Sequence, residues 1–286
     1  MPTLFDLHHL GHPKVIGSYL LDGDEPALVD CGPTTCADTL VAALADAGLR
    51  LTDVGHLLLT HIHLDHAGAA GVLVRRHPGL LVHVSEIGAP HLVDPSRLER
   101  SARRLYSQDF DSLWGELAPV PAANVCAIGE RVLGLEAFPA PGHASHHVAF
   151  LARDGSCYAG DSTGVRIHPS VHVEPMTPPP DVDLEAWSRT LGEIERRRPE
   201  RICVAHFGVF ADPAEHLARA RAGLARWAER VRGGATQEEF VAAAEAEIPA
   251  GADAVTAEAY RRAGPAWQSF LGLRRYWDNK AEREGG

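Results

Sequence analysis

The sequence predicts an α/β fold in which helices pack on the faces of a sheet. Short apolar runs alternate with amphipathic stretches from the N-terminus to beyond residue 200. Several of these runs are continuously apolar, as in strands that are covered on both faces. The predicted strands are VIGSYLL (15–21), PALVDCG (26–32), HLLLT (56–60), LLVHVS (80–85), HVAFLA (147–152), SCYAG (156–160) and RICVAH (201–206).

The stretches between these runs have the composition and spacing of helices. Residues 35–48 are rich in alanine and end at a glycine, which commonly terminates a helix. Residues 183–198 repeat apolar side chains at helical spacing and stop before Pro199. Two further regions are predicted to be helical: an insertion at about residues 88–120 and the chain from Pro213 onward.

Composition limits the classes of partner that this chain is expected to have. The formal net charge of −11 gives no general electrostatic attraction for nucleic acid or for an anionic membrane. The N-terminus lacks the pattern of a secretory signal, and no apolar run is long enough to span a membrane. The five cysteines form no CxxC pair. We therefore expect a cytoplasmic protein with reduced thiols and with neither nucleic acid nor membrane as a partner.

The strongest chemical signal is the segment HIHLDH (61–66), which directly follows the predicted strand HLLLT. Residues two apart in an extended chain project to the same side, so His61 and His63 can address one ion. Asp65 and His66 follow where the backbone should turn, and they can point at a second position nearby. Imidazole and carboxylate groups suit zinc and comparable divalent metals. The alternative is a histidine-rich turn at the surface.

Three more candidate ligands lie downstream, each where a predicted strand meets a loop. His143 precedes the run HVAFLA, Asp161 ends the run SCYAG, and His206 ends the run RICVAH. Open α/β sheets collect their sites at such strand ends. A single histidine at the end of a core strand is more often structural, but three such positions after HIHLDH favour a common metal site.

This ordered set resembles the metallo-β-lactamase superfamily and looks closest to its glyoxalase II-like hydrolases. The resemblance spans residues 15–210 and implies an αβ/βα sandwich, with two mixed sheets face to face, helices outside and metals at one edge. It implies two ligand sets that share one carboxylate: His61, His63 and His143 for the first ion, Asp65, His66 and His206 for the second, and Asp161 bridging both.

The resemblance also implies a division of the chain. Residues 1–211 are expected to form the catalytic domain, with the helical insertion at about 88–120, and residues 212–286 a C-terminal helical extension. The extension is expected either to cover the active site or to build a homodimer interface. We find no convincing glutathione-binding set in it, so the extension does not indicate the substrate of glyoxalase II.

The implied chemistry is hydrolysis of a small carbonyl substrate, namely a thioester, lactone, ester or amide. Two divalent ions, Zn²⁺ in the first place and Fe or Mn as alternatives, hold a bridging hydroxide that attacks the carbonyl. Asp65 is expected to pass a proton to the leaving group. No GxSxG motif or other nucleophile competes with this interpretation. The alternative is a persulfide dioxygenase, which shares the fold and uses one iron.

Four other residues are candidates for the surroundings of the metals. His146 and His147 adjoin a predicted ligand and are expected to orient it or to pack ordinarily. His168 follows Asp161 in a predicted loop and is a candidate for lining the pocket. Tyr106, with Phe110 and Trp114 of the same insertion, is expected to form either the pocket wall or plain core.

Overall fold

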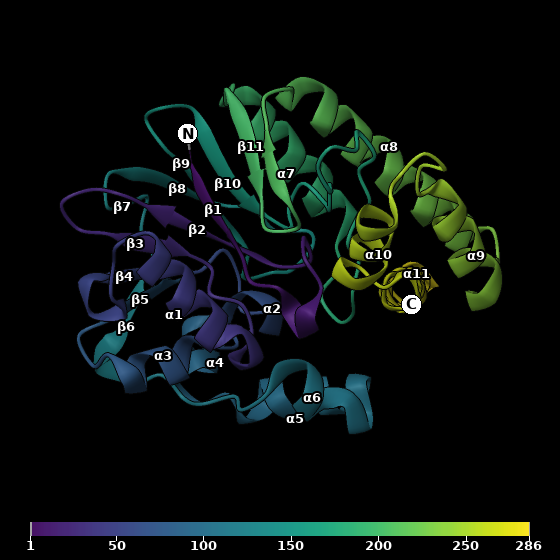
Figure 1. The fold of residues 1–286 in the computed structure, drawn as a ribbon. Coiled ribbons are helices and arrows are strands. Elements are labelled where there is room, and N and C mark those ends of the chain that lie inside the picture. The colour runs from purple at the N-terminus through teal and green to yellow at the C-terminus, as the bar shows by residue number, and fades with distance from the viewer. Residues whose placement is uncertain (1, 286) are drawn as a thin grey trace.

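Two six-stranded sheets form the centre of the computed structural model, which describes residues 2–285 (Figure 1). The first sheet has the order β1-β2-β3-β4-β5-β6 and is parallel from β3 to β6. Its strands are β1 (Thr3–Asp6), β2 (Gly17–Leu21), β3 (Ala27–Val29), β4 (His56–Leu58), β5 (Leu81–Val84) and β6 (Val125–Ala127).

The second sheet has the order β12-β11-β10-β9-β8-β7, and its one parallel pair is β10 with β11. Its strands are β7 (Arg131–Val132), β8 (Leu135–Pro139), β9 (Val148–Leu151), β10 (Ser156–Gly160), β11 (Arg201–Val204) and β12 (Gly208–Phe210). All five residues of β10 are buried, as expected for a central strand that is covered on both faces.

Helices cover the outer faces of both sheets (Figure 1). The helices within the sheet region are α1 (Ala37–Asp46), α2 (Leu64–Ala67), α3 (Ala70–Arg76), α4 (Ala89–Val93), α5 (Ser96–Tyr106), α6 (Phe110–Trp114) and α7 (Leu184–Arg196). The remaining helices are α8 (Pro213–Arg232), α9 (Gln237–Glu247), α10 (Ala254–Ala263) and α11 (Ala266–Gly285). Single 3₁₀ turns lie at His9–Gly11, Thr34–Cys36, Leu51–Asp53, Ser107–Asp109 and Ala122–Asn124.

The core is divided into layers by the two sheets. Between them, Tyr19 and Leu58 of the first sheet pack with Phe150 and Tyr158 of the second. On the outer face of the first sheet, helices α1 and α3 pack on β3, β4 and β5. On the outer face of the second sheet, α7 and α8 pack on β10 and β11. This four-layered arrangement confirms the predicted αβ/βα sandwich.

Each predicted strand contains a strand of the structure, and the two predicted helical regions are helical. The sequence pattern did not predict β1, β6, β7, β8 and β12, most of which are short or lie at sheet edges. The C-terminal helices extend the sandwich rather than stand apart from it. Tyr260 of α10 lies in the same apolar cluster as Ile167 and Met176, and Leu217 of α8 lies in the cluster beneath the second sheet.

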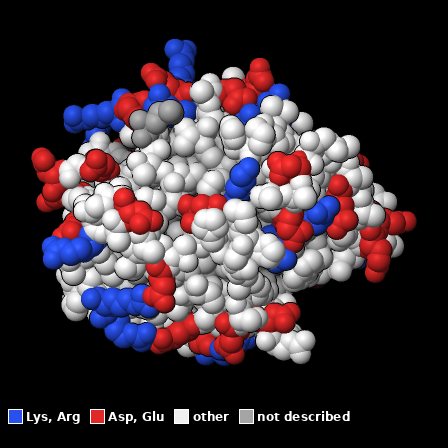
Figure 2. All heavy atoms as spheres, in the orientation of Figure 1, with Lys and Arg blue, Asp and Glu red and all other residues white. Residues whose placement is uncertain are grey.

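The surface and the cysteines agree with the composition. Both signs of charge are interspersed on the face shown in Figure 2, which has no continuous basic area among its described residues. None of the helices within residues 2–285 combines the length and hydropathy that crossing a bilayer requires. All five cysteines are free thiols, and Cys31, Cys36, Cys157 and Cys203 are buried.

Candidate metal centre

Two parallel strand pairs, one from each sheet, place the candidate ligands at a common edge. In the first sheet Val29 of β3 lies opposite Leu58 of β4, so Asp30 emerges beside Thr60. In the second sheet Gly160 of β10 lies opposite Val204 of β11, so Asp161 emerges near His206. Parallel strands bring their carboxyl ends to the same edge, which explains why polar residues directly after buried strands meet here.

The segment HIHLDH turns from strand to helix within a few residues. His63 is extended, with φ −61° and ψ 154°, and directly precedes α2. Asp65 and His66 therefore lie in the first helical turn, where their side chains leave in different directions from those of His61 and His63. One short segment can thus supply ligands to two neighbouring positions, as the spacing predicts.

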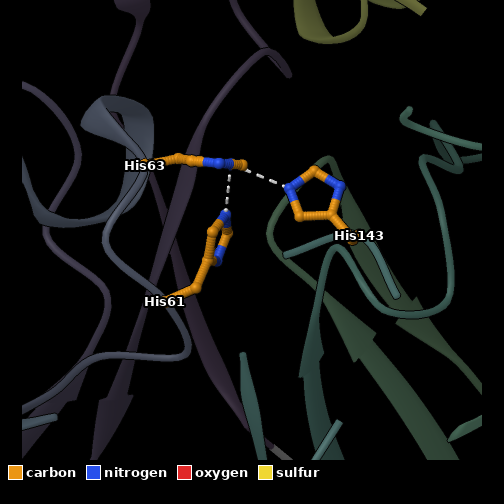
Figure 3. A group of neighbouring side chains, drawn as sticks. All are labelled: His61, His63 and His143. Carbon is orange, nitrogen blue, oxygen red and sulfur yellow. Dashed lines mark hydrogen bonds between the residues drawn. The ribbon is translucent and has the colours of Figure 1, made fainter. Parts of the chain in front are cut away.

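Three histidines form the first cluster. Figure 3 shows the rings of His61, His63 and His143 pointing toward one another. Nδ1 of His63 lies 3.0 Å from Nε2 of His61 and 2.8 Å from Nε2 of His143. Nitrogen ligands of a tetrahedral zinc ion are about 3.3 Å apart, given zinc–nitrogen distances of about 2.0–2.1 Å. The cluster is therefore slightly tighter than a zinc site.

The second cluster consists of Asp65, His66, Asp161 and His206, whose ligand atoms lie within 4.8 Å of one another. Oδ1 of Asp161 lies 3.4 Å from Nε2 of His66 and 3.5 Å from Nε2 of His206. Its other oxygen, Oδ2, lies 3.4 Å from Nε2 of His143 in the first cluster. One carboxylate thus faces both clusters, which is the arrangement that a bridging ligand requires.

Buried atoms without hydrogen-bond partners mark the centre of the second cluster. Nε2 of His66, Nε2 of His206 and both carboxylate oxygens of Asp161 are buried and unpartnered among the described residues. An unpaired buried polar atom is costly, and a buried carboxylate more so. A metal cation coordinated by these atoms would remove the cost, so the residues fit the ions that the pattern implies.

The outer nitrogens of the histidines fix which ring atom is free to bind a metal. Nδ1 of His143 donates to the carbonyl of Met176 at 2.7 Å, and Nδ1 of His206 donates to the carbonyl of Val15. A carbonyl only accepts, so Nδ1 must carry the proton in both rings. Nε2 is then the lone-pair nitrogen and faces the cluster, as in metal sites whose ligands are held from behind.

Asp30 holds the ring of His66, a role that the sequence analysis missed. Its carboxylate accepts from the Thr60 amide, from the Thr60 hydroxyl and from Nδ1 of His66, each at 2.8 Å. A signal was present, because Asp30 directly follows a buried strand just as Asp161 does. His66, the partner of Asp30, lies 36 residues further along the chain, and only the pairing of β3 with β4 brings the two together.

Gly160 lets the two sheets approach each other at the site. It has φ +50°, which an L side chain rarely adopts. A Cβ atom there would lie 2.6 Å from Oγ1 of Thr60 and 2.7 Å from Nε2 of His147. The absence of a side chain brings the end of β10 against the loop after β4, and Asp161 is carried to the histidines.

Burial and mutual charge set the protonation of the ligands. Burial, reinforced by the neighbouring histidines, lowers the pKa of His61 and of His63 well below the usual value. These rings therefore stay neutral and keep a lone pair for a metal. Burial alone would also lower the pKa of His66, but the carboxylates of Asp161 and Asp65 raise it well above the usual value. The field that favours a proton there also favours a metal cation.

A cavity of about 520 Å³ opens onto the two clusters. His63, Asp65 and His206 line it on the side of the metal centre. The insertion contributes residues of α4, α5 and α6, and the C-terminal helices contribute Arg262 and Gln268. The cavity has the size of a small-molecule pocket and lies between the sheet domain and the helical tail.

The four other candidate residues do not all lie at the metal centre or the cavity. His146 lines the cavity, and its ring stacks on that of His61 with the centroids 6.0 Å apart. Nε2 of His147 accepts from the backbone amide of Asp161 at 3.2 Å. Tyr106 lines the cavity, and its hydroxyl lies 3.4 Å from Oε1 of Gln268. His168 is exposed and does not line the cavity.

The two other aromatic residues of the insertion divide between the pocket wall and the core. Trp114 lines the cavity, whereas Phe110 is fully buried beneath the guanidinium of Arg103 and belongs to the core. His9 is also buried and lines the cavity. Its ring stacks on Trp114, and nothing in the local sequence around His9 indicates this contact.

Comparison with known families agrees with the geometry. Residues 15–206 match the model of the metallo-beta-lactamase superfamily. The chain belongs to this superfamily. The match begins at Val15, whose carbonyl holds His206, and ends at His206 itself, so it contains all seven candidate ligands of this metallo-β-lactamase fold.

Solved structures share the fold across nearly the whole chain. The metallo-β-lactamase superfamily protein ST1585 from Sulfolobus tokodaii is 20% identical, with a TM-score of 0.67 over 96% of this chain and 99% of that one. The family protein TTHA1429 from Thermus thermophilus is 23% identical, with a TM-score of 0.64 over 94% of this chain and 89% of that one. The C-terminal helices are therefore within the aligned region.

Two relatives have names that state a thioesterase activity. The atrochrysone carboxyl ACP thioesterase of Cryptosporiopsis sp. (strain 8999) is 27% identical over 193 residues, which are 66% of this chain and 48% of that protein. The match thus spans about half the length of the relative. The name of the Cryptosporiopsis protein describes thioester hydrolysis by that protein.

Proposed function

We propose that this protein is a binuclear metal-dependent hydrolase of a small carbonyl compound, with a thioester or lactone as the preferred substrate. The observation that carries the proposal is the position of Asp161. Its two buried oxygens face two separate ligand clusters, and neither oxygen has a hydrogen-bond partner among the described residues. A single ion would leave one oxygen and part of the second cluster without a function.

The donor set favours two divalent ions, with zinc as the first choice. Imidazole and carboxylate ligands suit zinc, iron and manganese alike. When bound, such ions turn water into a nucleophile near neutral pH and polarise the substrate carbonyl. His61, His63 and His143 would hold one ion and Asp65, His66 and His206 the other, with Asp161 shared.

Asp65 is the residue that we assign to proton transfer. Its carboxylate lines the cavity, whereas Asp161 does not. Oδ2 of Asp65 lies 3.3 Å from Nε2 of His206, which fixes one of its oxygens toward the cluster. A carboxylate that belongs to the cluster and borders the substrate space can take a proton there and deliver it to a departing thiolate or alkoxide.

The surroundings support hydrolysis of a ligand that is bordered by two separate segments of the chain. Tyr106 and Gln268 approach each other from the insertion and from the tail, so both segments border the same cavity. Restricting bulk water strengthens every electrostatic interaction at the reacting carbonyl. The named thioesterase relative also favours a thioester over an amide substrate.

The test begins with metal quantification on the protein as purified, followed by assays of the loaded enzyme on thioesters, lactones and β-lactams. Two ions per chain with turnover of one class supports the proposal. A single iron with oxygen consumption on glutathione persulfide would instead identify a dioxygenase. For Asp65, the variant Asp65→Asn should lose most turnover, and full turnover with both metals retained would refute its role.

A further inference from the structure

Helix α5 presents an uncovered face to the cavity. None of its residues is fully buried, although its sequence SRLERSARRLY has clearly separated apolar and charged sides. Leu98, Ala102 and Leu105 line the cavity from this helix. Leu98 also packs against the core cluster that lies under the first sheet, but the rest of this apolar face borders the pocket, where a ligand can cover it.

The same face carries two arginines that have no partner of their own. Arg97 and Arg104 line the cavity, and neither forms an ion pair or side-chain hydrogen bond with any residue in the range 2–285. They are seven residues apart, which places them on one side of the helix with their Cα atoms about 10 Å apart along the axis.

Arg103 of the same helix shows the contrasting arrangement. It binds Glu99 at 2.9 Å and Asp111 at 2.7 Å, and it covers the ring of Phe110. Arg103, which does not line the cavity, is therefore neutralised within the protein. The side that faces the cavity is not, although the chain as a whole has a net charge of −11.

The opposite wall does not supply the missing negative charge. Arg262 of α10 also lines the cavity and is bound to Glu258 at 2.6 Å. Asp65 belongs to the metal cluster, and Asp181, which accepts from the hydroxyl of Ser145 at 2.7 Å, forms no ion pair with either arginine of α5 among residues 2–285. The arginines of α5 thus form a positive strip beside an apolar strip, within the cavity that reaches the metal centre.

We propose that the ligand of this cavity is an elongated amphipathic anion, and that Arg97 and Arg104 determine this specificity. Its apolar part packs on the leucines of α5, and its negatively charged group lies along Arg97 and Arg104. The proposal rests on the proposed hydrolase function for the reaction, but the binding preference does not require turnover. Carboxylate, phosphate and sulfonate groups share the chemistry that a guanidinium binds.

Binding of two fluorescent probes to the full-length protein tests the preference without any reaction. The probe 8-anilinonaphthalene-1-sulfonate carries an anion, and N-phenyl-1-naphthylamine has the same rings without it. We expect Arg97→Gln combined with Arg104→Gln to weaken binding of the anionic probe about three- to tenfold. The expected change is small because exposed ion pairs are individually weak. The dissociation constant of the neutral probe should change less than twofold.

Arg100→Gln is the matched control, because Arg100 lies on the same helix, carries the same charge and does not line the cavity. This variant should leave both dissociation constants unchanged. Equal weakening of both probes by the double variant, or the same weakening by Arg100→Gln, would overturn the proposal. A protein that hydrolyses nothing can still give either result, so the two proposals fail separately.

Hydrolysis then shows which end of the substrate carries the charge. Octanoyl-N-acetylcysteamine is neutral, its ω-carboxy analogue places the anion on the acyl group, and octanoyl coenzyme A places phosphates on the thiol. We expect kcat/KM to be highest for one charged substrate, and its advantage over the neutral thioester to disappear in the double variant. An advantage that persists in the double variant would contradict the assignment.

Discussion

Replacing Asp30 by asparagine should weaken metal binding at the second cluster while leaving binding at the first cluster unchanged. The Asp30 carboxylate accepts three hydrogen bonds, one of them from Nδ1 of His66. An asparagine amide keeps one acceptor oxygen and introduces an NH₂ group, so at least one of the three donors then faces a donor. If that donor is Nδ1 of His66, the ring must move its proton to Nε2, the atom that faces the second cluster.

The expected loss of metal affinity follows from the number of hydrogen bonds that change. Hydrogen bonds to charged groups contribute about 1.5–3 kcal/mol each, and one of the three directly fixes the metal-binding nitrogen of His66. Loss of a residue that orients a ligand typically costs about 10–100-fold in metal affinity. We therefore expect Asp30→Asn to weaken the second site by that factor, with little effect on the cluster formed by His61, His63 and His143.

Competition with a chromophoric chelator measures both affinities in one zinc titration. The wild-type chain should show two sites, and Asp30→Asn should show one unchanged site and one weakened site. Asp38→Asn is the control, since Asp38 is an exposed carboxylate bound to Arg76 at the surface. Two unchanged sites in Asp30→Asn would refute the reasoning from the outer nitrogen of His66.

Two further predictions concern the C-terminal helices. Burial would raise the pKa of Glu247, but hydrogen bonds from two arginines and Trp227 lower it from 4.5 to about 2. The folded state thus binds this proton less readily than the unfolded state, so the stabilisation is present above pH 4.5 and is lost as the pH falls toward 2. Glu247→Gln should cost about 1–3 kcal/mol at pH 7, and the difference from wild type should shrink at pH 3. Gly272→Ala in α11 should destabilise the protein by about 1–3 kcal/mol through overpacking, because its Cβ would lie 2.0 Å from the Thr177 carbonyl oxygen.

Urea unfolding followed by circular dichroism checks both. Glu238→Gln on the same helix is the control for Glu247, because Glu238 is exposed and makes no side-chain hydrogen bond within residues 2–285. A loss of stability in Glu247→Gln that is independent of pH would contradict the ion-pair account. Gly192 of α7 faces open space, so Gly192→Ala should stabilise the protein by about 0.5–1 kcal/mol. Equal effects at Gly192 and Gly272 would contradict the packing argument.

The sandwich and the convergence of the ligands could be predicted because local signals carry them. Each of His143, Asp161 and His206 follows or precedes a strong apolar run, and strand ends gather at one edge whatever the detailed order of strands. The spacing within HIHLDH likewise fixes which side chains diverge. These features depend on backbone geometry over a few residues, and the periodicity of the sequence reports that geometry directly.

Contacts that depend on tertiary placement could not be predicted in the same way. Asp30 reaches His66 only because β3 and β4 are neighbours, and His9 reaches Trp114, far along the chain, through a loop with no periodicity. Trp114 and Phe110 are close in sequence, yet one lines the cavity and the other is core. The sequence marks such residues as aromatic or ionisable, but it does not say what covers them.

Both ligand clusters draw on the two halves of the sandwich. His61 and His63 come from the first sheet and meet His143 from the second, while Asp65 and His66 meet Asp161 and His206. Each bound ion would therefore act as a clasp that fastens one half of the molecule to the other. A shortage of metal in the cell would then have a second effect besides loss of activity. The two halves of the sandwich would separate more readily at this edge, and proteases would shorten the lifetime of the folded chain.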